Sequence, residues 1–414
     1  MMRLAVIFES SPFDRKGLFN AVHNRVKHLL ATGECAIDVF CVHSRDNAFT
    51  RRVRHTPEVP SVDETVVDGI RYRLLWYRFS ILDNVLLEKL HVRPWLFRRF
   101  MDLHVDLLKG YDAVIAHSFC GGLFALAAHE RFGVPYYVTW HGSDVHTHPW
   151  RVPVILEDTR AVMESARCNF FVSRALLDAS EKIISNARKE VLYNGVSEDF
   201  VKYSPEDRAA VRERYGLAPE DKVVAFVGNI VKVKNVLSLP EIFAQVAKGY
   251  DGPLKFWIIG DGKLRKPLEA TMDLSFRPND HSLSFRPNEV SGEISFFGNQ
   301  PSPAMPDIMN CIDVLVLPSL NEGLPLVCAE ALSCGAAVVG SDVGGIAEVI
   351  GSENVVPLGS PSGDPSRPYD GSFVNGMAEK VVAALTGQIP SQTLPDEISW
   401  ARTAALELAA LKSL

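Results

Sequence analysis

Short apolar runs alternate with longer amphipathic stretches along the first half of the chain. The apolar runs have the length of buried strands and lie at 3–8, 36–42, 112–116, 135–140 and 168–172. The stretches with helical spacing that separate most of them lie at 18–31, 95–109, 121–131, 154–167 and 174–187. This alternation is typical of parallel strands joined by crossover helices, so we predict an α/β sheet here.

The second half of the chain repeats this pattern. Its strand candidates are 222–227, 254–259, 293–297, 313–317 and 336–340. Its helical stretches are 236–248, 303–311, 325–334 and 373–386. We therefore predict two doubly wound, Rossmann-like domains. Open parallel sheets bind ligands beyond the carboxyl ends of their strands, so we expect a ligand to be held between the two sheets.

The length of 414 residues is comfortable for two domains. The polar segment 195–206 is the expected junction, which gives domains at 1–203 and 204–396. Residues 359–372 are rich in Gly, Pro, Ser and Asp and indicate a surface loop. The motif Ser275–Asn279 recurs at Ser284–Asn288, which we interpret as a small duplicated insertion.

Composition narrows the classes of function. The net charge of -7 does not indicate a basic nucleic-acid-binding domain, so no nucleic-acid partner is expected. The seven cysteines include no Cys-x-x-Cys pair and are odd in number, which favours reduced, buried thiols. No apolar run approaches the roughly 20 residues of a bilayer span, and the first run resembles a strand rather than a signal peptide. We expect a cytoplasmic protein.

The segment 317–332 is the most informative motif. A buried strand ends at Leu317, and an apolar helix follows a turn. Glu330 lies inside that helix, where an ionised carboxylate is costly unless a partner such as a ribose diol satisfies it. Glu322 lies just before the helix, where free amides favour an anion such as a diphosphate. The alternative makes Glu330 half of a buried ion pair and Glu322 a helix-start residue. The turn expected to hold the diphosphate comprises Gly323, Leu324, Pro325 and Leu326.

Two further segments follow strand candidates. A strand ends at Gly228, and the loop after it carries Asn229, Lys232 and Lys234. A lysine at the end of a strand can neutralise a leaving diphosphate, whereas a solvated basic loop is the structural alternative. His141 directly follows the strand 135–140, where a lone histidine is more often structural than catalytic.

The pattern Pro-Ser-x-x-Glu-Gly-x-Pro…Glu-Ala at 318–331 resembles the signature of family 4 glycosyltransferases. The segments Trp140–Val145 and Tyr193–Val196 are also similar to this family, so the resemblance spans most of the chain. It implies the GT-B fold, with two Rossmann-like domains facing a central cleft. It also implies that the last helix, within 397–414, returns to complete the first domain.

The resemblance implies roles for individual residues. Glu322 contacts the donor sugar, Glu330 the ribose, and His141 the sugar near the reacting carbon. Lys234 matches the lysine of the family, whereas Asn229 stands where the family has an arginine. We therefore expect His141, Lys234 and Glu322 to be catalytic and Asn229 to lie in the donor site.

Gly17 follows the first strand, where the family has a glycine-rich loop that approaches the diphosphate and the acceptor. Many members have two glycines, and this chain has only Gly17, preceded by Lys16. Backbone approach to the donor and a plain turn remain alternative interpretations.

The implied activity is retaining transfer of a sugar from a nucleoside diphosphate sugar to a glycan or lipid-linked acceptor, in surface polysaccharide or glycolipid biosynthesis. No two aspartates are separated by a single residue, so the metal-binding Asp-x-Asp of other glycosyltransferases is absent. We expect no metal and no cofactor, with Lys234 in the place of a cation.

Other interpretations stay open. A non-catalytic relative that binds a nucleotide or glycan is supported by Asn229. A dinucleotide-dependent oxidoreductase is suggested only by Gly260-Asp261-Gly262, and Arg265 replaces the third glycine of that fingerprint. The aromatic and basic stretch 91–100 has the composition of an interfacial helix in peripheral contact with a membrane. The alternative is a surface helix with its aromatic side chains in the core.

Overall fold

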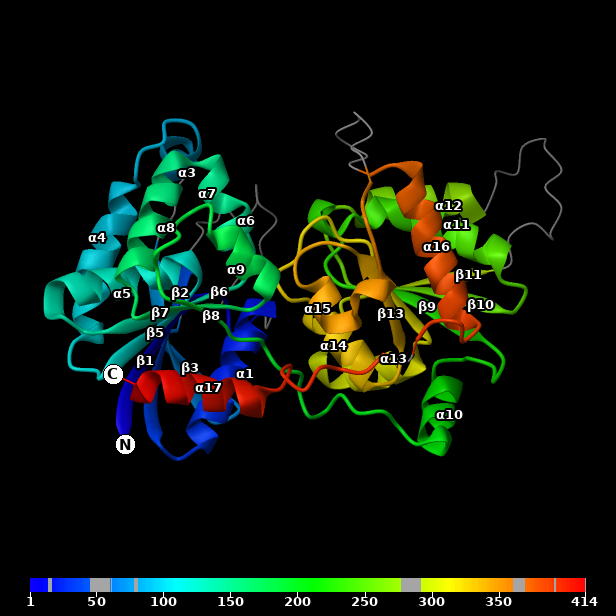
Figure 1. Ribbon diagram of the computed structural model, residues 1–414, viewed down its shortest axis with the longest axis horizontal. Coiled ribbons are helices and arrows are strands. Elements are labelled where there is room, and N and C mark those ends of the chain that lie inside the picture. The colour runs from blue at the N-terminus through cyan, green and yellow to red at the C-terminus, as the bar shows by residue number, and fades with distance from the viewer. Residues whose placement is uncertain are drawn as a thin grey trace. The chain divides into compact units, whose positions relative to one another are not determined.

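The computed structural model describes residues 1–13, 17–44, 60, 62–77, 81–276, 292–359, 369–390 and 392–413. The chain forms two compact units (Figure 1). The first comprises Met1–Gly195 and Ser399–Leu414, and the second comprises Val196–Ile398. Each unit is built around its own sheet.

The sheet of the first unit has the strand order β3-β4-β2-β1-β5-β6-β7-β8. All its pairs are parallel except β3 with β4, which are antiparallel at one edge. The strands are β1 (Met2–Glu9), β2 (Cys35–Ser44), β3 (Glu64–Val67), β4 (Ile70–Tyr77), β5 (Ala113–His117), β6 (Tyr136–Trp140), β7 (Cys168–Phe171) and β8 (Lys189–Val191).

The five strands predicted for this half are all present, whereas β3, β4 and β8 were not predicted. β3 and β4 form a hairpin whose turn is Asp68-Gly69, with φ angles of 48° and 80°. Asp-Gly is a favoured two-residue hairpin turn because both residues tolerate positive φ. The sheet is therefore not wholly parallel.

Helices cover this sheet and bring the end of the chain back to its beginning. α17 packs beside α1, and its Ala404, Leu408 and Leu411 join the buried core (Figure 1). A Cβ at Gly195 would lie 2.0 Å from the backbone nitrogen of Trp400, so only glycine lets the two segments meet. The helices are α1 (Gly17–Ala31), α3 (Ile81–Glu88), α4 (Trp95–His104), η1 (Val105–Leu108), α5 (Ser118–Phe132), α6 (Ser143–His146), α7 (His148–Arg151), α8 (Pro153–Ser165), α9 (Arg174–Ser180) and α17 (Trp400–Lys412).

The sheet of the second unit is parallel throughout, in the order β11-β10-β9-β12-β13-β14. Its strands are β9 (Lys222–Val227), β10 (Leu254–Ile259), β11 (Glu293–Gly298), β12 (Val314–Leu317), β13 (Ala337–Ser341) and β14 (Val355–Val356). Its helices are α10 (Pro205–Arg214), η2 (Lys232–Lys234), η3 (Val236–Ser238), α11 (Leu239–Gly249), α12 (Arg265–Phe276), η4 (Ser302–Ala304), α13 (Met305–Cys311), α14 (Leu326–Ser333), α15 (Ile346–Ile350), η5 (Ser352–Asn354) and α16 (Gly371–Leu385).

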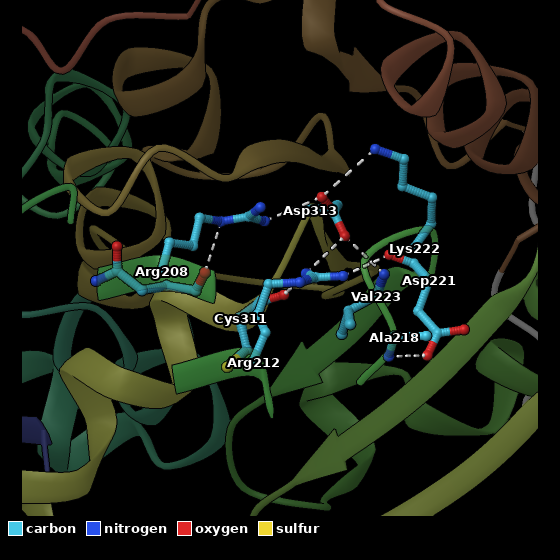
Figure 2. Close-up of polar contacts among 9 residues, drawn as sticks. Arg208, Arg212, Ala218, Asp221, Lys222, Val223, Cys311 and Asp313 are labelled. Atoms are coloured by element: carbon cyan, nitrogen blue, oxygen red, sulfur yellow. Dashed lines mark hydrogen bonds and ion pairs between the residues drawn. The ribbon is translucent and has the colours of Figure 1, made fainter. Parts of the chain in front are cut away.

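A charged cluster fastens α10 to the amino end of this sheet (Figure 2). Asp313, just before β12, accepts from Arg208 Nη2 at 3.0 Å and from the Val223 N–H at 2.8 Å. Arg212 Nη1 lies 3.3 Å from Asp313 Oδ2, the oxygen that also accepts from the Val223 N–H, whereas Arg208 contacts Oδ1. Because ligands of such sheets bind at the carboxyl ends of the strands, we assign this cluster a structural role.

Two segments differ from their sequence-based predictions. The helix expected over 174–187 ends at Ser180. The loop expected over 359–372 already gives way to α16 at Gly371, which is capped by Asp370, and residues 360–368 lie outside the described residues. Most of the duplicated motif, from 277 onward, also lies outside them. None of the helices in the described ranges combines the length and apolarity that a bilayer span requires.

Candidate functional site

Lys234 and Glu322 form an ion pair in the loops that follow β9 and β12. Lys234 Nζ lies 2.5 Å from Glu322 Oε1, and the Ser319 hydroxyl donates to the same oxygen at 2.6 Å. The two charged side chains are only 19% and 11% exposed. Two residues proposed separately from the sequence are thus in direct contact, and partial burial strengthens their attraction.

The backbone holds this pair in place from the β9 side. Lys234 ends the turn η2, and the next residue, Asn235, takes a left-handed conformation with a φ of 51°. The Leu320 N–H donates to the Val233 carbonyl at 2.8 Å. This bond ties the loop after β12 to the loop after β9, so the two partners approach on fixed segments.

The loop after β13 supports Glu322 from the other side. A Cβ at Gly344 would lie only 1.9 Å from the Glu322 carbonyl oxygen, and Gly344 has a φ of 53°. The Gly345 N–H donates to the Gly323 carbonyl at 3.0 Å, and the Ser341 hydroxyl donates to the Ser319 carbonyl. The motif Ser341–Glu348 therefore buttresses the turn that carries Glu322.

Glu330 lies on α14, which begins at Leu326 after Pro325 in the N-cap position. Leu324 and Pro325 are buried. Among the described residues the Glu330 carboxylate has no hydrogen-bond or ion-pair partner, so the buried ion-pair interpretation is not supported. Burial raises the pKa of Glu330 to about 7. A partly buried acceptor without a partner is a candidate for ligand contact.

Asn229 is exposed in the loop after β9. The preceding Gly228 has a φ of 152°, and a Cβ at Gly260 would lie 2.0 Å from the Gly228 carbonyl oxygen. A Cβ at Gly262 would lie 2.4 Å from the Ile230 carbonyl oxygen. The glycines that suggested a dinucleotide fingerprint are therefore explained by close packing of the loops after β9 and β10.

In the first unit, His141 follows β6 and contacts a second histidine. Its Nε2 lies 3.1 Å from Nδ1 of His117, the last residue of β5. Burial and the nearby Arg25 guanidinium lower the pKa of His141 to about 3. Burial, Arg25 and His141 lower the pKa of His117 well below its ordinary range. Both imidazoles are therefore neutral at physiological pH.

Asp144 fixes the backbone at this position rather than the imidazole. Its buried carboxylate accepts from the Gly142 N–H at 2.8 Å and from the His141 N–H at 3.2 Å. Gly142 has a φ of 148°, a conformation that favours glycine. The turn His141–Asp144 is thus held by its own carboxylate.

Gly17 is the first residue of α1 and is exposed. A Cβ added there would meet nothing within 4 Å, so packing does not require glycine at this position. Gly17 and His141 belong to the first unit, and Lys234, Glu322 and Glu330 to the second. Lys16 lies outside the described residues.

Three polar contacts at the strand ends were not anticipated from the sequence. They are Ser319 on Glu322, His117 on His141, and the Tyr77 hydroxyl, which donates to Glu9 Oε1 at 2.6 Å at the end of β1. Ser319 belongs to the quoted pattern, and His117 directly follows an apolar run. The sequence signal that could have indicated these contacts is the position of the residues at the carboxyl ends of strands, where ligands of parallel sheets bind.

The stretch 91–100 contains the start of α4, which has two different faces. Trp95 is 60% exposed and Leu96 37% exposed, whereas Phe100 is buried. Phe97 and Phe100 pack with each other at 6.2 Å between ring centroids. The buried Phe100 fits the interpretation of a surface helix with aromatic side chains in the core, whereas the membrane contact stays a prediction.

Both halves of the sequence match known protein families. The sequence model of the family described as "Glycosyl transferases group 1" matches residues 221–367, and that of the "Glycosyl transferase 4-like domain" matches residues 17–195. A putative teichuronic acid biosynthesis glycosyltransferase of Bacillus subtilis is 28% identical over 250 residues, covering 60% of this chain and 56% of that protein. N-acetyl-alpha-D-glucosaminyl L-malate synthase of Bacillus anthracis is 27% identical, covering 60% of this chain and 59% of that protein. The matches thus span little more than half the length of these relatives.

Solved structures resemble the chain over its full length. Sucrose-phosphate synthase from Thermosynechococcus elongatus has a TM-score of 0.68 at 18% identity, covering 100% of this chain and 95% of that one. HepE from Anabaena, solved with UDP and glucose, has a TM-score of 0.65 at 16% identity and full coverage of both chains. At such identity the likeness shows the fold, which is GT-B. The two family models together match most of the sequence, and the structural likeness agrees with them. The chain therefore belongs to the group 1 glycosyltransferase family.

Proposed function

We propose that this protein is a retaining glycosyltransferase that uses a nucleoside diphosphate sugar. The observation that carries the proposal is the Lys234–Glu322 ion pair at the carboxyl ends of β9 and β12. The names of the relatives support glycosyl transfer, since they include a glycosyltransferase of teichuronic acid biosynthesis and D-inositol 3-phosphate glycosyltransferases. Structural neighbours solved with UDP or UDP-glucose support a nucleotide-sugar donor.

The donor would bind along the second unit. The Glu330 carboxylate, which has no partner in the described part of the chain, accepts from the ribose hydroxyls, and this would offset the cost of its burial. The diphosphate lies against the turn Gly323–Leu326, where free amides at the start of α14 favour an anion. Asn229 lies in the adjoining loop after β9. Gly17, which belongs to the first unit, is proposed to contact the diphosphate. The hydroxyls of the sugar contact Glu322.

The reaction breaks the bond between the anomeric carbon and the diphosphate and forms a bond to the acceptor oxygen. Negative charge develops on the leaving diphosphate oxygen, and this oxygen takes the proton that the acceptor hydroxyl loses. Lys234 stabilises this charge in the role that a metal ion has in other glycosyltransferases, and a pre-positioned cation needs no reorganisation during the reaction. His141 contacts the sugar near the reacting carbon. We propose that neither metal nor cofactor is required.

Transfer assays with purified protein test this function. The chain would be incubated with UDP-, GDP- and ADP-sugars and a panel of glycan and lipid-linked acceptors, with and without EDTA. We expect a product whose anomeric configuration matches that of the donor and a rate that EDTA leaves unchanged. We also expect Glu322→Ala to lose about 100-fold in kcat while its thermal unfolding stays cooperative. Loss of activity with EDTA that Mg²⁺ or Mn²⁺ restores would overturn the metal-free mechanism.

The acceptor side is proposed to include α4 as a peripheral contact with the cytoplasmic face of a membrane. Trp95, Leu96 and Leu103 are exposed on this helix, together with Arg98 and Arg99. Apolar side chains beside arginines suit an anionic lipid surface. Flotation with phosphatidylglycerol vesicles should recover the wild type, and Trp95→Ala/Leu96→Ala should bind less. Equal recovery of both proteins would contradict this contact.

A non-catalytic protein that binds nucleotide sugars is the second candidate. It is favoured by Asn229, because the family has an arginine at this position. The two candidates differ in turnover. A binding protein raises its melting temperature with nucleoside diphosphates and yields neither transfer nor hydrolysis products.

A further inference from the structure

His117 and His141 meet through their ring nitrogens at the carboxyl ends of β5 and β6. His117 Nδ1 and His141 Nε2 are 3.1 Å apart, and the ring planes are inclined by 37°. Two neutral imidazoles attract each other in this geometry only if one facing nitrogen carries a proton and the other does not. The contact therefore links the tautomers of the two rings.

The surroundings keep both rings neutral. Arg25 is buried at 1% exposure, donates to the Thr139 hydroxyl at 2.7 Å, and lies 3.3 Å from the buried Glu407 carboxylate. Its positive charge and the burial of the rings both disfavour an imidazolium. A single proton is thus shared across the contact, and two arrangements are available.

The far nitrogen of His117 distinguishes these arrangements. Its Nε2 is buried and has no hydrogen-bond partner among the described residues. If His141 donated, His117 would carry its proton on Nε2 as a buried, unpaired donor. If His117 donates through Nδ1, Nε2 is left as an unpaired acceptor. Orphaned buried N–H groups are rarer than under-satisfied acceptors, and the nearby Arg25 charge also favours a lone pair.

We propose that His117 is a positioning residue that donates its Nδ1–H to Nε2 of His141 and thereby makes Nδ1 of His141 a hydrogen-bond donor toward the sugar. Nδ1 of His141 has no partner within the described part of the chain, and the residue is only partly buried. Asp144 contacts the backbone N–H groups of this turn, and among the described residues it is His117 that hydrogen-bonds the His141 imidazole. This assignment rests on the proposed function, because a sugar oxygen is the acceptor it requires.

The tautomers can be read directly in the wild type by long-range ¹H–¹⁵N NMR on histidine-labelled protein at pH 7.5. We expect both rings to carry the proton on Nδ1. A proton on Nε2 of His141 overturns the proposal. This measurement needs no substrate, so it tests the role of His117 even if the protein transfers no sugar. Absence of transfer from every donor would contradict the proposed function and leave the tautomer result unaffected.

Variants connect the tautomer to catalysis. His117→Phe keeps a ring without nitrogen, and His117→Asn retains an amide near the position of Nδ1. We expect His117→Phe to lower kcat about 10- to 100-fold with little change in KM for the donor, and to give a mixed tautomer at His141. His117→Asn should recover most of the rate and the Nδ1–H tautomer.

His146 supplies a matched control. It is also a histidine of the first unit with a buried, unpartnered Nε2 among the described residues. His146→Phe should leave kcat and the His141 signals near those of the wild type. Wild-type kcat and unchanged His141 signals in His117→Phe would overturn the proposal. If His117→Phe does not fold, the wild-type tautomer and His117→Asn still decide it.

Discussion

The two units present different chemistry at the carboxyl ends of their sheets. In the second unit the ends of β9 and β12 carry opposite charges, Lys234 and Glu322, which remain 19% and 11% exposed. In the first unit the ends of β5 and β6 carry two histidines that burial and Arg25 keep neutral. Lys234 and Glu322 are paired and partly hydrated, whereas the two neutral histidines lie near the buried Arg25 guanidinium.

This difference matches the parts of a nucleotide sugar that each unit is proposed to contact. A leaving diphosphate gains negative charge, which a pre-positioned ammonium stabilises. A sugar hydroxyl is neutral and is recognised by directional hydrogen bonds, which a fixed imidazole tautomer supplies. In this proposal, side chains at the carboxyl ends of strands serve charge stabilisation in the second unit and orientation of the sugar in the first.

The largest effect on catalysis is expected at the Lys234–Glu322 ion pair. Lys234→Ala should lower kcat about 1,000-fold, because it removes the cation proposed for the leaving diphosphate. Steady-state transfer assays measure this effect. Lys232→Ala is the matched control, since Lys232 is exposed in the same loop and should stay within about threefold of wild type. Equal losses in the two variants would remove the distinction between Lys234 and a general basic loop.

Glu330 provides a pH-dependent test of the donor site. Its pKa is raised to about 7 by burial, so its carboxylate is ionised above that pH and protonated below it. Donor affinity should therefore be greatest above pH 7 and fall as pH drops through 7, because the ionised carboxylate accepts better from the ribose. Titration calorimetry with the nucleoside diphosphate from pH 5.5 to 8.5 measures this.

The same carboxylate gives a stability signature without ligand. A raised pKa in the folded state costs stability as pH rises from the unfolded pKa of 4.5 toward 7. Glu330→Gln should thus raise the free energy of unfolding by about 3 kcal/mol at pH 8 and by little at pH 4.5. Its donor affinity should be about tenfold lower at pH 8 and independent of pH. If the donor affinity of Glu330→Gln depended on pH as that of the wild type does, Glu330 would not have this role.

A smaller effect is expected when the charge beneath the histidines is removed. Arg25→Met with Glu407→Leu replaces a buried ion pair by apolar side chains, which often preserves the fold. Because burial is the main cause of the low His141 pKa and Arg25 the second, the pKa should rise only part of the way from about 3 toward 6.5. Titration of the His141 ring by NMR measures this. An unchanged titration curve would show that Arg25 does not act on the imidazole.

The smallest effect is expected at Asn229. Asn229→Arg adds the positive charge that the family carries in this loop, and it should raise kcat by a few-fold, on the order of one hydrogen bond to a charged group. The same transfer assay measures it, with Asn229→Gln as a control of similar length without charge. A lower rate in the arginine variant would indicate that this site is adapted to asparagine.

The sequence predicted the parts of the fold that have strong local patterns. The ten predicted strands are all present because each contains a short, largely apolar run, although β11 at the edge of its sheet is only partly buried. The β3–β4 hairpin was missed, because its four-residue first strand alternates only briefly, although Asp68-Gly69 marked its turn. The segments near β14 and α15 are too short for periodicity to detect.

The site was predictable residue by residue but not as a set of contacts. The motif pointed to Glu322 and Lys234, which are 88 positions apart, yet only the fold brings them to 2.5 Å. The need for glycine at position 344, where an added Cβ would lie 1.9 Å from the Glu322 carbonyl oxygen, arises from packing between two loops that no local sequence pattern reveals. The contact of His117 with His141 is likewise a product of the neighbouring strands β5 and β6.

Single-turnover sugar transfer by wild type and Lys234→Ala in EDTA, and again in excess Mg²⁺, tests the central claim most directly. The account predicts rapid transfer by the wild type in both conditions and a loss of about 1,000-fold in the variant that Mg²⁺ does not restore. Wild-type transfer that stops in EDTA, or a variant as fast as wild type, would contradict it.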